Sequence, residues 1–187
     1  MRILGSLICS WLLLHCAAAR PSAMAQRASA SETKQACRAF VQRFYEWYVP
    51  KALHESGVPA SDLALKYQRS VFSPDLIRAL REDSEAQARA AGAIVGLDFD
   101  PFLNTQDPSS HYVVSDVMLS GNRCRADVYG VSSGAKSSKP DVLPELAFEN
   151  GRWLFVNFHY GKSKRSNDEN LLSILRTLRE GRQNSPK

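Results

Sequence analysis

The sequence contains none of the short motifs that mark the common enzyme classes. It has no Gly-x-Ser-x-Gly turn, no phosphate-binding loop and no redox Cys-x-x-Cys pair. The histidines that follow the first thirty residues are His54, His111 and His159, and they lack the paired spacing that is typical of zinc ligands. The sequence therefore assigns no catalytic residues, no metal and no cofactor.

The sequence also has only one long apolar run, residues 3–14. A membrane-spanning helix needs roughly 20 apolar residues, so this run is too short. It stands between Arg2 and the small residues of Ala23-Met24-Ala25, which is the layout of a secretory signal peptide. We expect cleavage near Ala25, which would remove residues 1–25. Cleavage after Ala19 is the alternative. The mature protein would then be periplasmic or secreted, without a membrane span.

Strong charge of one sign is absent as well. The chain has a formal net charge of +5, and removal of Arg2 and Arg20 leaves +3 (5 − 2). This mild positive charge suits an acidic partner or an anionic envelope polymer, and it argues against a nucleic-acid-binding protein. About 160 mature residues are enough for one domain with a substantial core.

Cysteine is scarce, and only Cys37 and Cys124 would survive cleavage. Two cysteines in an oxidising compartment can form one disulfide, here joining the first helix to the sheet. The loop-entropy model gives roughly 4 kcal/mol of stabilisation for the loop of about 87 residues that this bond would close. Two buried free thiols are the alternative.

Helical patterns fill the first half of the chain. After a flexible lead-in at residues 26–32, apolar residues recur every three or four positions from residue 32 to 49, where Pro50 should end the helix. Ser61 should cap a short helix, and Ser73 a longer one over residues 74–91.

Residues 97–108 form the most unusual segment of the sequence. Proline, aspartate and asparagine make regular structure improbable there, yet the segment is too apolar for a free linker. We expect Phe99, Phe102 and Leu103 to anchor this loop in the core.

Apolar residues alternate in the second half. Strands are expected at residues 112–119, 123–131, 142–149 and 152–160, with tight turns at Gly121-Asn122 and Asn150-Gly151. The last strand is bulky on both faces, which predicts a central position in the sheet. A helix should follow from Asn167 to Gly181, with a flexible tail at 182–187.

This order of elements predicts a single α+β domain over residues 33–181. Its N-terminal helices would pack on a curved four-stranded antiparallel sheet, with a C-terminal helix added. The arrangement is similar to the cone-shaped fold of nuclear transport factor, ketosteroid isomerase and the cystatins. Function does not follow from such a likeness.

Three segments carry a family resemblance: residues 40–48, 100–107 and 151–160. Together they resemble the bacterial exported family of unknown function that includes the YbjP and YqhG envelope proteins. The resemblance implies an envelope location and a nuclear-transport-factor-like shape, and it implies no established activity. Some members look lipidated. This chain differs, because Ile8 and His15 precede its two leader cysteines where a small residue is required.

Candidate ligand-binding residues fall into two groups. Asp100, Asn104, Gln106 and Asp107 offer oxygen atoms that suit calcium or a ligand at the mouth of the cone, although such side chains commonly satisfy loop backbone groups instead. The second group would line the concave side of the sheet, where isomerase-like enzymes use an Asp base and a Tyr donor. Its members are Tyr112, Tyr129 and His159, with Asp127 and Asn157 beside them.

Three functions remain open at this point. The first is a non-enzymatic binding module for an envelope or secreted protein, inhibitor-like or immunity-like, or for an envelope ligand. The second is a small-molecule enzyme of the isomerase-like cone type, and the third is a passive structural protein of the envelope. A deep pocket with a buried carboxylate of raised pKa would favour the enzyme. A filled cone with exposed apolar surface would favour a partner protein, with the oligomeric state unknown.

Overall fold

The computed structural model describes residues 23–54, 57–161 and 169–184. Residues 1–22, which hold most of the expected signal peptide, lie outside the described residues, as does the expected cap Asn167. The elements, in chain order, are α1 (Ala23–Ala52), α2 (Ala60–Tyr67), the 3-10 turn η1 (Arg69–Val71), α3 (Pro74–Arg89), β1 (His111–Ser120), β2 (Arg123–Ser132), β3 (Ala135–Lys136), β4 (Val142–Glu149), β5 (Arg152–Tyr160) and α4 (Leu171–Asn184).

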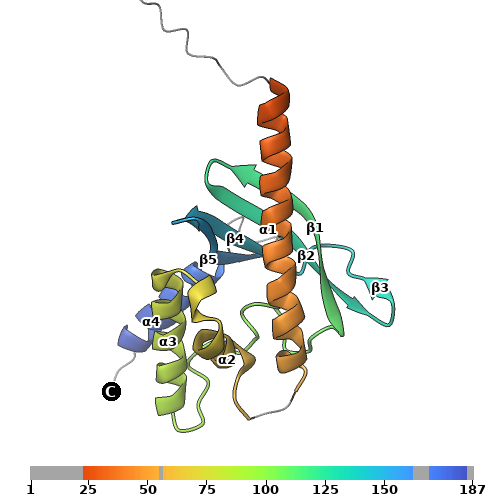
Figure 1. The fold of residues 1–187 in the computed structure, drawn as a ribbon. Coiled ribbons are helices and arrows are strands. Elements are labelled where there is room, and N and C mark those ends of the chain that lie inside the picture. Colours follow the sequence, from red (N-terminus) through yellow and green to blue (C-terminus); the bar gives the residue numbers. More distant parts are fainter. Residues whose placement is uncertain (1–22, 55–56, 162–168, 185–187) are drawn as a thin grey trace, which may run out of the picture.

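The four long strands form an antiparallel meander in the order β1-β2-β4-β5, and the short β3 pairs with β2. Helix α1 crosses one face of this sheet, while α2, α3 and α4 gather near β5 (Figure 1). The expected α+β class with a C-terminal helix is confirmed. The side chains of Cys124, Ala126 and Val128 face α1 from β2, as the alternation predicts.

Helix α1 is longer than the sequence pattern indicates. It covers 30 residues and includes positions 26–32, which were expected to be a flexible lead-in. These residues contain neither glycine nor proline and have favourable helix propensity, so the packed part of α1 can propagate through them at little cost. Pro50 lies inside the last turn rather than ending the helix.

The remaining helix boundaries differ by a few residues. Ser73 caps α3 as expected, accepting a hydrogen bond from the Leu76 amide at 3.3 Å. Helix α2 instead begins after Pro59, without a side-chain cap, so Ser61 lies inside it. Helix α4 continues past Gly181 into the expected flexible tail because Arg182 is anchored to Asp83 at 2.6 Å.

Strand β5 lies at the edge of the sheet, so the expected central position is wrong. Its register against β4 passes from Leu146–Phe155 to Glu145–Asn157, which leaves Val156 as a bulge. Other chain segments cover its outer edge: the Ser73 amide bonds to the Phe155 carbonyl at 2.9 Å, and the Tyr160 amide bonds to the Glu169 carbonyl at 3.2 Å. The consecutive residues Trp153, Leu154 and Phe155 are all buried, so both faces of this edge strand are covered as well, and this cover explains why both carry bulky side chains.

Both predicted hairpins are present. Asn150 and Gly151 have φ values of 50° and 78°, as a type I′ turn requires. The connection between β2 and β4 contains the two-residue strand β3.

A disulfide joins Cys37 of α1 to Cys124 of β2, with Cα atoms 6.7 Å apart and a sequence separation of 87. Such a bond is typical of proteins in an oxidising environment outside the cytosol. Among the helices that the structure describes, none is both long and apolar enough to cross a membrane.

Candidate functional site

Aromatic rings fill the space between α1 and the sheet. Phe102 of the 97–108 loop lies at the centre, with its ring centroid 4.9 Å from that of Phe158 and 5.2 Å from that of Phe72. Phe44 of α1 completes the packing with a centroid distance of 4.8 Å to Phe155. The interior that would hold a substrate in a cone-shaped enzyme is therefore occupied by the protein's own side chains.

Three tyrosine hydroxyl groups hold the 97–108 loop in this interior. Tyr45 donates to the Phe102 carbonyl at 2.9 Å, and Tyr160 donates to the Pro101 carbonyl at 2.9 Å. Burial raises the pKa of both phenols well above its ordinary value. Phe102 and Leu103 are fully buried, so the expected anchoring of the loop is confirmed.

The third hydroxyl group, that of Tyr48, donates to Asp100 Oδ2 at 2.6 Å. Asp100 Oδ1 accepts the Phe102 and Leu103 amides at 2.9 and 3.1 Å. Burial raises the pKa of the Asp100 carboxyl above its ordinary value, although the hydrogen bonds act in the opposite direction. The Asp100 carboxylate thus accepts three hydrogen bonds that hold its own loop in place.

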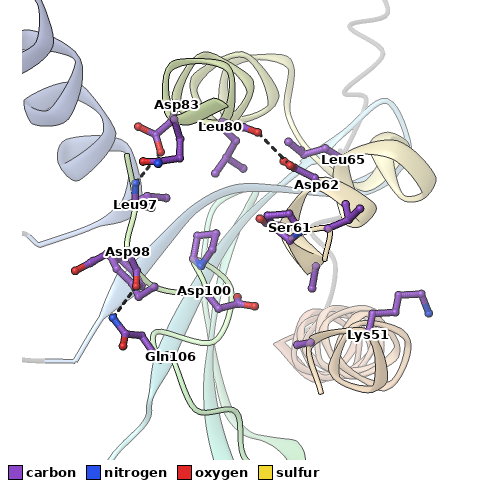
Figure 2. A pocket seen from close by; sticks show the side chains of 18 of the residues that line it. Lys51, Ser61, Asp62, Leu65, Leu80, Asp83, Leu97, Asp98, Asp100 and Gln106 are labelled. Carbon is purple, nitrogen blue, oxygen red and sulfur yellow. Dashed lines mark hydrogen bonds between the residues drawn. The ribbon is translucent and has the colours of Figure 1, made fainter. Parts of the chain in front are cut away.

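The outer side of the same loop borders an open hollow of about 800 Å³, which we call the cleft (Figure 2). Its other walls are the C-terminal end of α1, the start of α2 and the inward side of α3. Leu65, Leu80 and Leu97 supply apolar surface. Two helix ends, one face of α3 and the loop therefore meet at one place.

Polar contacts fix the walls of the cleft. Asp83 of α3 accepts the Leu97 amide at 2.9 Å and pairs with Arg182 of α4, which also donates to the Val95 carbonyl at 2.9 Å. Between the neighbouring walls α2 and α3, the Ser84 hydroxyl donates to Asp62 at 3.1 Å. These contacts give the cleft a defined shape before any ligand is bound.

The candidate residues from the loop do not form one site. Asp100 and Gln106 line the cleft, and Gln106 donates to the Asp98 carbonyl at 2.7 Å. Asn104 borders a smaller hollow with residues 137–141 and donates to the Asp141 carbonyl at 3.0 Å. Asp107 is exposed, and its amide bonds to the Thr105 hydroxyl.

The candidate residues from the sheet are separated as well. Tyr112 is buried against Tyr45, with ring centroids 5.7 Å apart. Tyr129 and His159 alternate with core residues and lie on the sheet face that is turned away from α1. They are therefore remote from the cleft, together with Asp127 and Asn157.

A polar network covers part of this open sheet face. Glu145 contacts His159 Nε2 at 2.8 Å and Arg123 at 2.9 Å. Burial acts to raise the pKa of the Glu145 carboxyl, but hydrogen bonds and the charges of His159 and Arg123 outweigh it, and the net shift is downward. The network occupies these side chains with one another.

Sequence reasoning missed the cleft walls on α2 and α3. Asp62 and Ser84 belong to helices that look ordinary in the sequence, and their proximity depends on tertiary packing. One local signal was present: Leu53 and Val58 are apolar residues in a polar connection and are 48% and 49% exposed, and Val58 lines the cleft.

No protein-family model and no curated protein matches this chain. Solved structures do match. A protein of unknown function from Bacteroides thetaiotaomicron VPI-5482 has 18% identity and a TM-score of 0.52, covering 73% of this chain and 98% of its own. A chain of the type VI effector–immunity complex Tae3–Tai3 from Ralstonia pickettii has 22% identity and a TM-score of 0.48, covering 68% and 96%. The first of these likenesses supports the fold, and it carries no function.

Proposed function

We propose that this protein is an exported binding module, inhibitor-like or immunity-like, whose cleft holds a segment of a protein partner. The observation that carries the proposal is the contrast between the filled interior and the open cleft. The aromatic rings around Phe102 occupy the interior, whereas the cleft is open and is lined in part by the exposed apolar residue Val58. Exposed apolar side chains beside a preformed hollow are typical of protein-binding surfaces.

Export is part of this proposal, and the disulfide supports it. Cys37 and Cys124 are joined in the core of the domain, which suits folding in the periplasm or outside the cell after removal of residues 1–25. The resemblance to the exported envelope family, carried by residues 40–48, 100–107 and 151–160, agrees with the same location.

One observation favours an enzyme as the second candidate. The Asp100 carboxyl lies 2.6 Å from the Tyr48 hydroxyl and has a raised pKa, as a general base of the isomerase type would. However, a general base needs a lone pair directed at the substrate. Asp100 uses both oxygens to accept hydrogen bonds from Tyr48 and the loop backbone, so the binding module is the better supported function.

Position-specific photo-crosslinking in the producing organism tests the proposal. A benzophenone amino acid would replace Val58, which lines the cleft and is 49% exposed, and, as the matched control, Met118 on the open sheet face, which is 62% exposed. We expect a discrete protein adduct from position 58 that Ser61→Trp abolishes by filling the cleft and that Met118→Trp leaves unchanged. Adducts only from position 118, or none from position 58, would contradict the proposal.

A further inference from the structure

We infer that the partner segment held by the cleft is cationic, a flexible stretch that bears arginine or lysine side chains. This inference rests on the proposed function and specifies the chemistry of the partner. The protein as a whole has a positive charge of +5, so a cleft of the opposite sign is a local departure from the rest of the surface. Opposite charge in a hollow directs association and selects among partners.

Four carboxylates border the cleft, and two of them are already compensated or engaged. Asp83 is paired with Arg182 at 2.6 Å, and Asp100 is held by Tyr48 and its own loop. Asp62 accepts a hydrogen bond only from the neutral Ser84 hydroxyl, and no cation is paired with Asp62 or Asp98 among the described residues. Figure 2 shows them on opposite sides of the hollow, on α2 and on the 97–108 loop.

The described lining contains one Lys or Arg residue, Lys51, and it does not neutralise these carboxylates. Its Nζ donates to the Trp47 carbonyl at 3.0 Å and lies 4.0 Å from the centroid of the Trp47 ring. These contacts turn Lys51 back along α1, and Figure 2 shows it extending away from the hollow. The cleft therefore has two negative charges that a ligand can compensate.

The apolar part of the cleft completes the match. Leu65, Leu80 and Leu97 line the same hollow as the two carboxylates, and the partly exposed Leu97 offers most of this surface to a hydrocarbon chain. Arginine and lysine have long apolar stems with a charged end, so one side chain can cover the leucines and reach a carboxylate. An anionic polymer such as nucleic acid, or an anionic membrane, would be repelled at the same place.

The test uses two labelled flexible peptides as probes on the whole mature protein, with binding followed by fluorescence anisotropy. One probe carries arginine and leucine residues, and the other has glutamate in place of each arginine. We expect the arginine probe to bind and the double variant Asp62→Asn/Asp98→Asn to weaken its Kd about tenfold, which corresponds to about 1.4 kcal/mol. The matched control, Asp116→Asn/Asp127→Asn on the sheet, should leave the Kd unchanged.

Two results would overturn the inference: equal or tighter binding of the glutamate probe, or an unchanged Kd in the cleft double variant. Asp98→Lys provides a second variant at an exposed position and should abolish binding of the arginine probe without unfolding the protein. The peptide assay does not use the natural partner. If it fails while the position-58 adduct persists, the charge inference falls and the binding-module proposal stands.

Discussion

The two sides of the 97–108 loop differ in almost every physical respect. On the inner side, Phe102 and Leu103 are fully buried, and the carbonyls of Pro101 and Phe102 accept hydrogen bonds from tyrosine hydroxyl groups. On the outer side, Asp98 and Gln106 are exposed along the cleft. A single segment thus closes the interior to small molecules and builds a wall of a surface that suits a partner.

Removal of the Phe102 ring should have the largest effect on the inner side. Phe102→Ala leaves a cavity among rings that cannot collapse into it, so we expect about 4 kcal/mol of destabilisation and a fall in Tm of roughly 10 °C. Gln106→Ala on the outer side should change stability by less than about 0.5 kcal/mol. Calorimetry measures the Tm of both variants. Equal falls in Tm would contradict the proposed difference between the two sides of the loop.

The wall of the cleft behind the loop should come next in effect. Arg182→Ala leaves Asp83, which is 5% exposed, as a buried charge without its partner. We expect a loss of roughly 3 kcal/mol in chemical denaturation, since unpaired buried charges are costly. The matched control is Arg179→Ala in the same helix. Its contact with Glu82 is 3.7 Å long and exposed, so it should cost less than about 1 kcal/mol.

If Arg182→Ala and Arg179→Ala proved equally mild, the Asp83–Arg182 pair would not be what fixes the cleft wall. The shape of the cleft would then depend mainly on apolar packing.

A smaller effect should follow from removing one hydroxyl group on the inner side. Tyr45→Phe leaves the buried Phe102 carbonyl without its donor, so we expect a loss of about 1–2 kcal/mol in urea unfolding. Tyr67→Phe, at a position that is 61% exposed, should have no measurable effect. A loss of the same size at both positions would show that the hydroxyl group does not hold the loop.

The inner side could be predicted from sequence and the outer side could not. Phe99, Phe102 and Leu103 stand out because apolar residues in an irregular segment need a place to be buried. In contrast, Asp62 and Asp98 are ordinary surface residues until α2 and the loop come together. The disulfide and the hairpin at Asn150-Gly151 were predictable, since each depends on local or pairwise rules.

The position of β5 shows where local rules fail. Bulk on both faces of the strand was interpreted as a central position, but the cover at its edge comes from Ser73 and Glu169 in distant segments. The same limit applies to Arg182, which continues α4 because Asp83 is nearby in space. Tertiary contacts of this kind leave no periodic signal in the sequence.

The smallest effect is expected on the open sheet face, where polar contacts do not support the loop. The folded-state pKa of Glu145 is lowered, so its ionised form stabilises the fold above the unfolded pKa of about 4.3, and this contribution is lost as pH falls through the lower folded pKa. Glu145→Gln should therefore cost about 0.5 kcal/mol at pH 7 and nothing near pH 2, since the pair is partly exposed and screened. Glu149→Gln, exposed on the same strand, is the control. If Glu145→Gln lost the same free energy of unfolding at every pH, packing of the side chain, and not its charge, would stabilise this face. The open sheet face would then resemble the buried side of the loop.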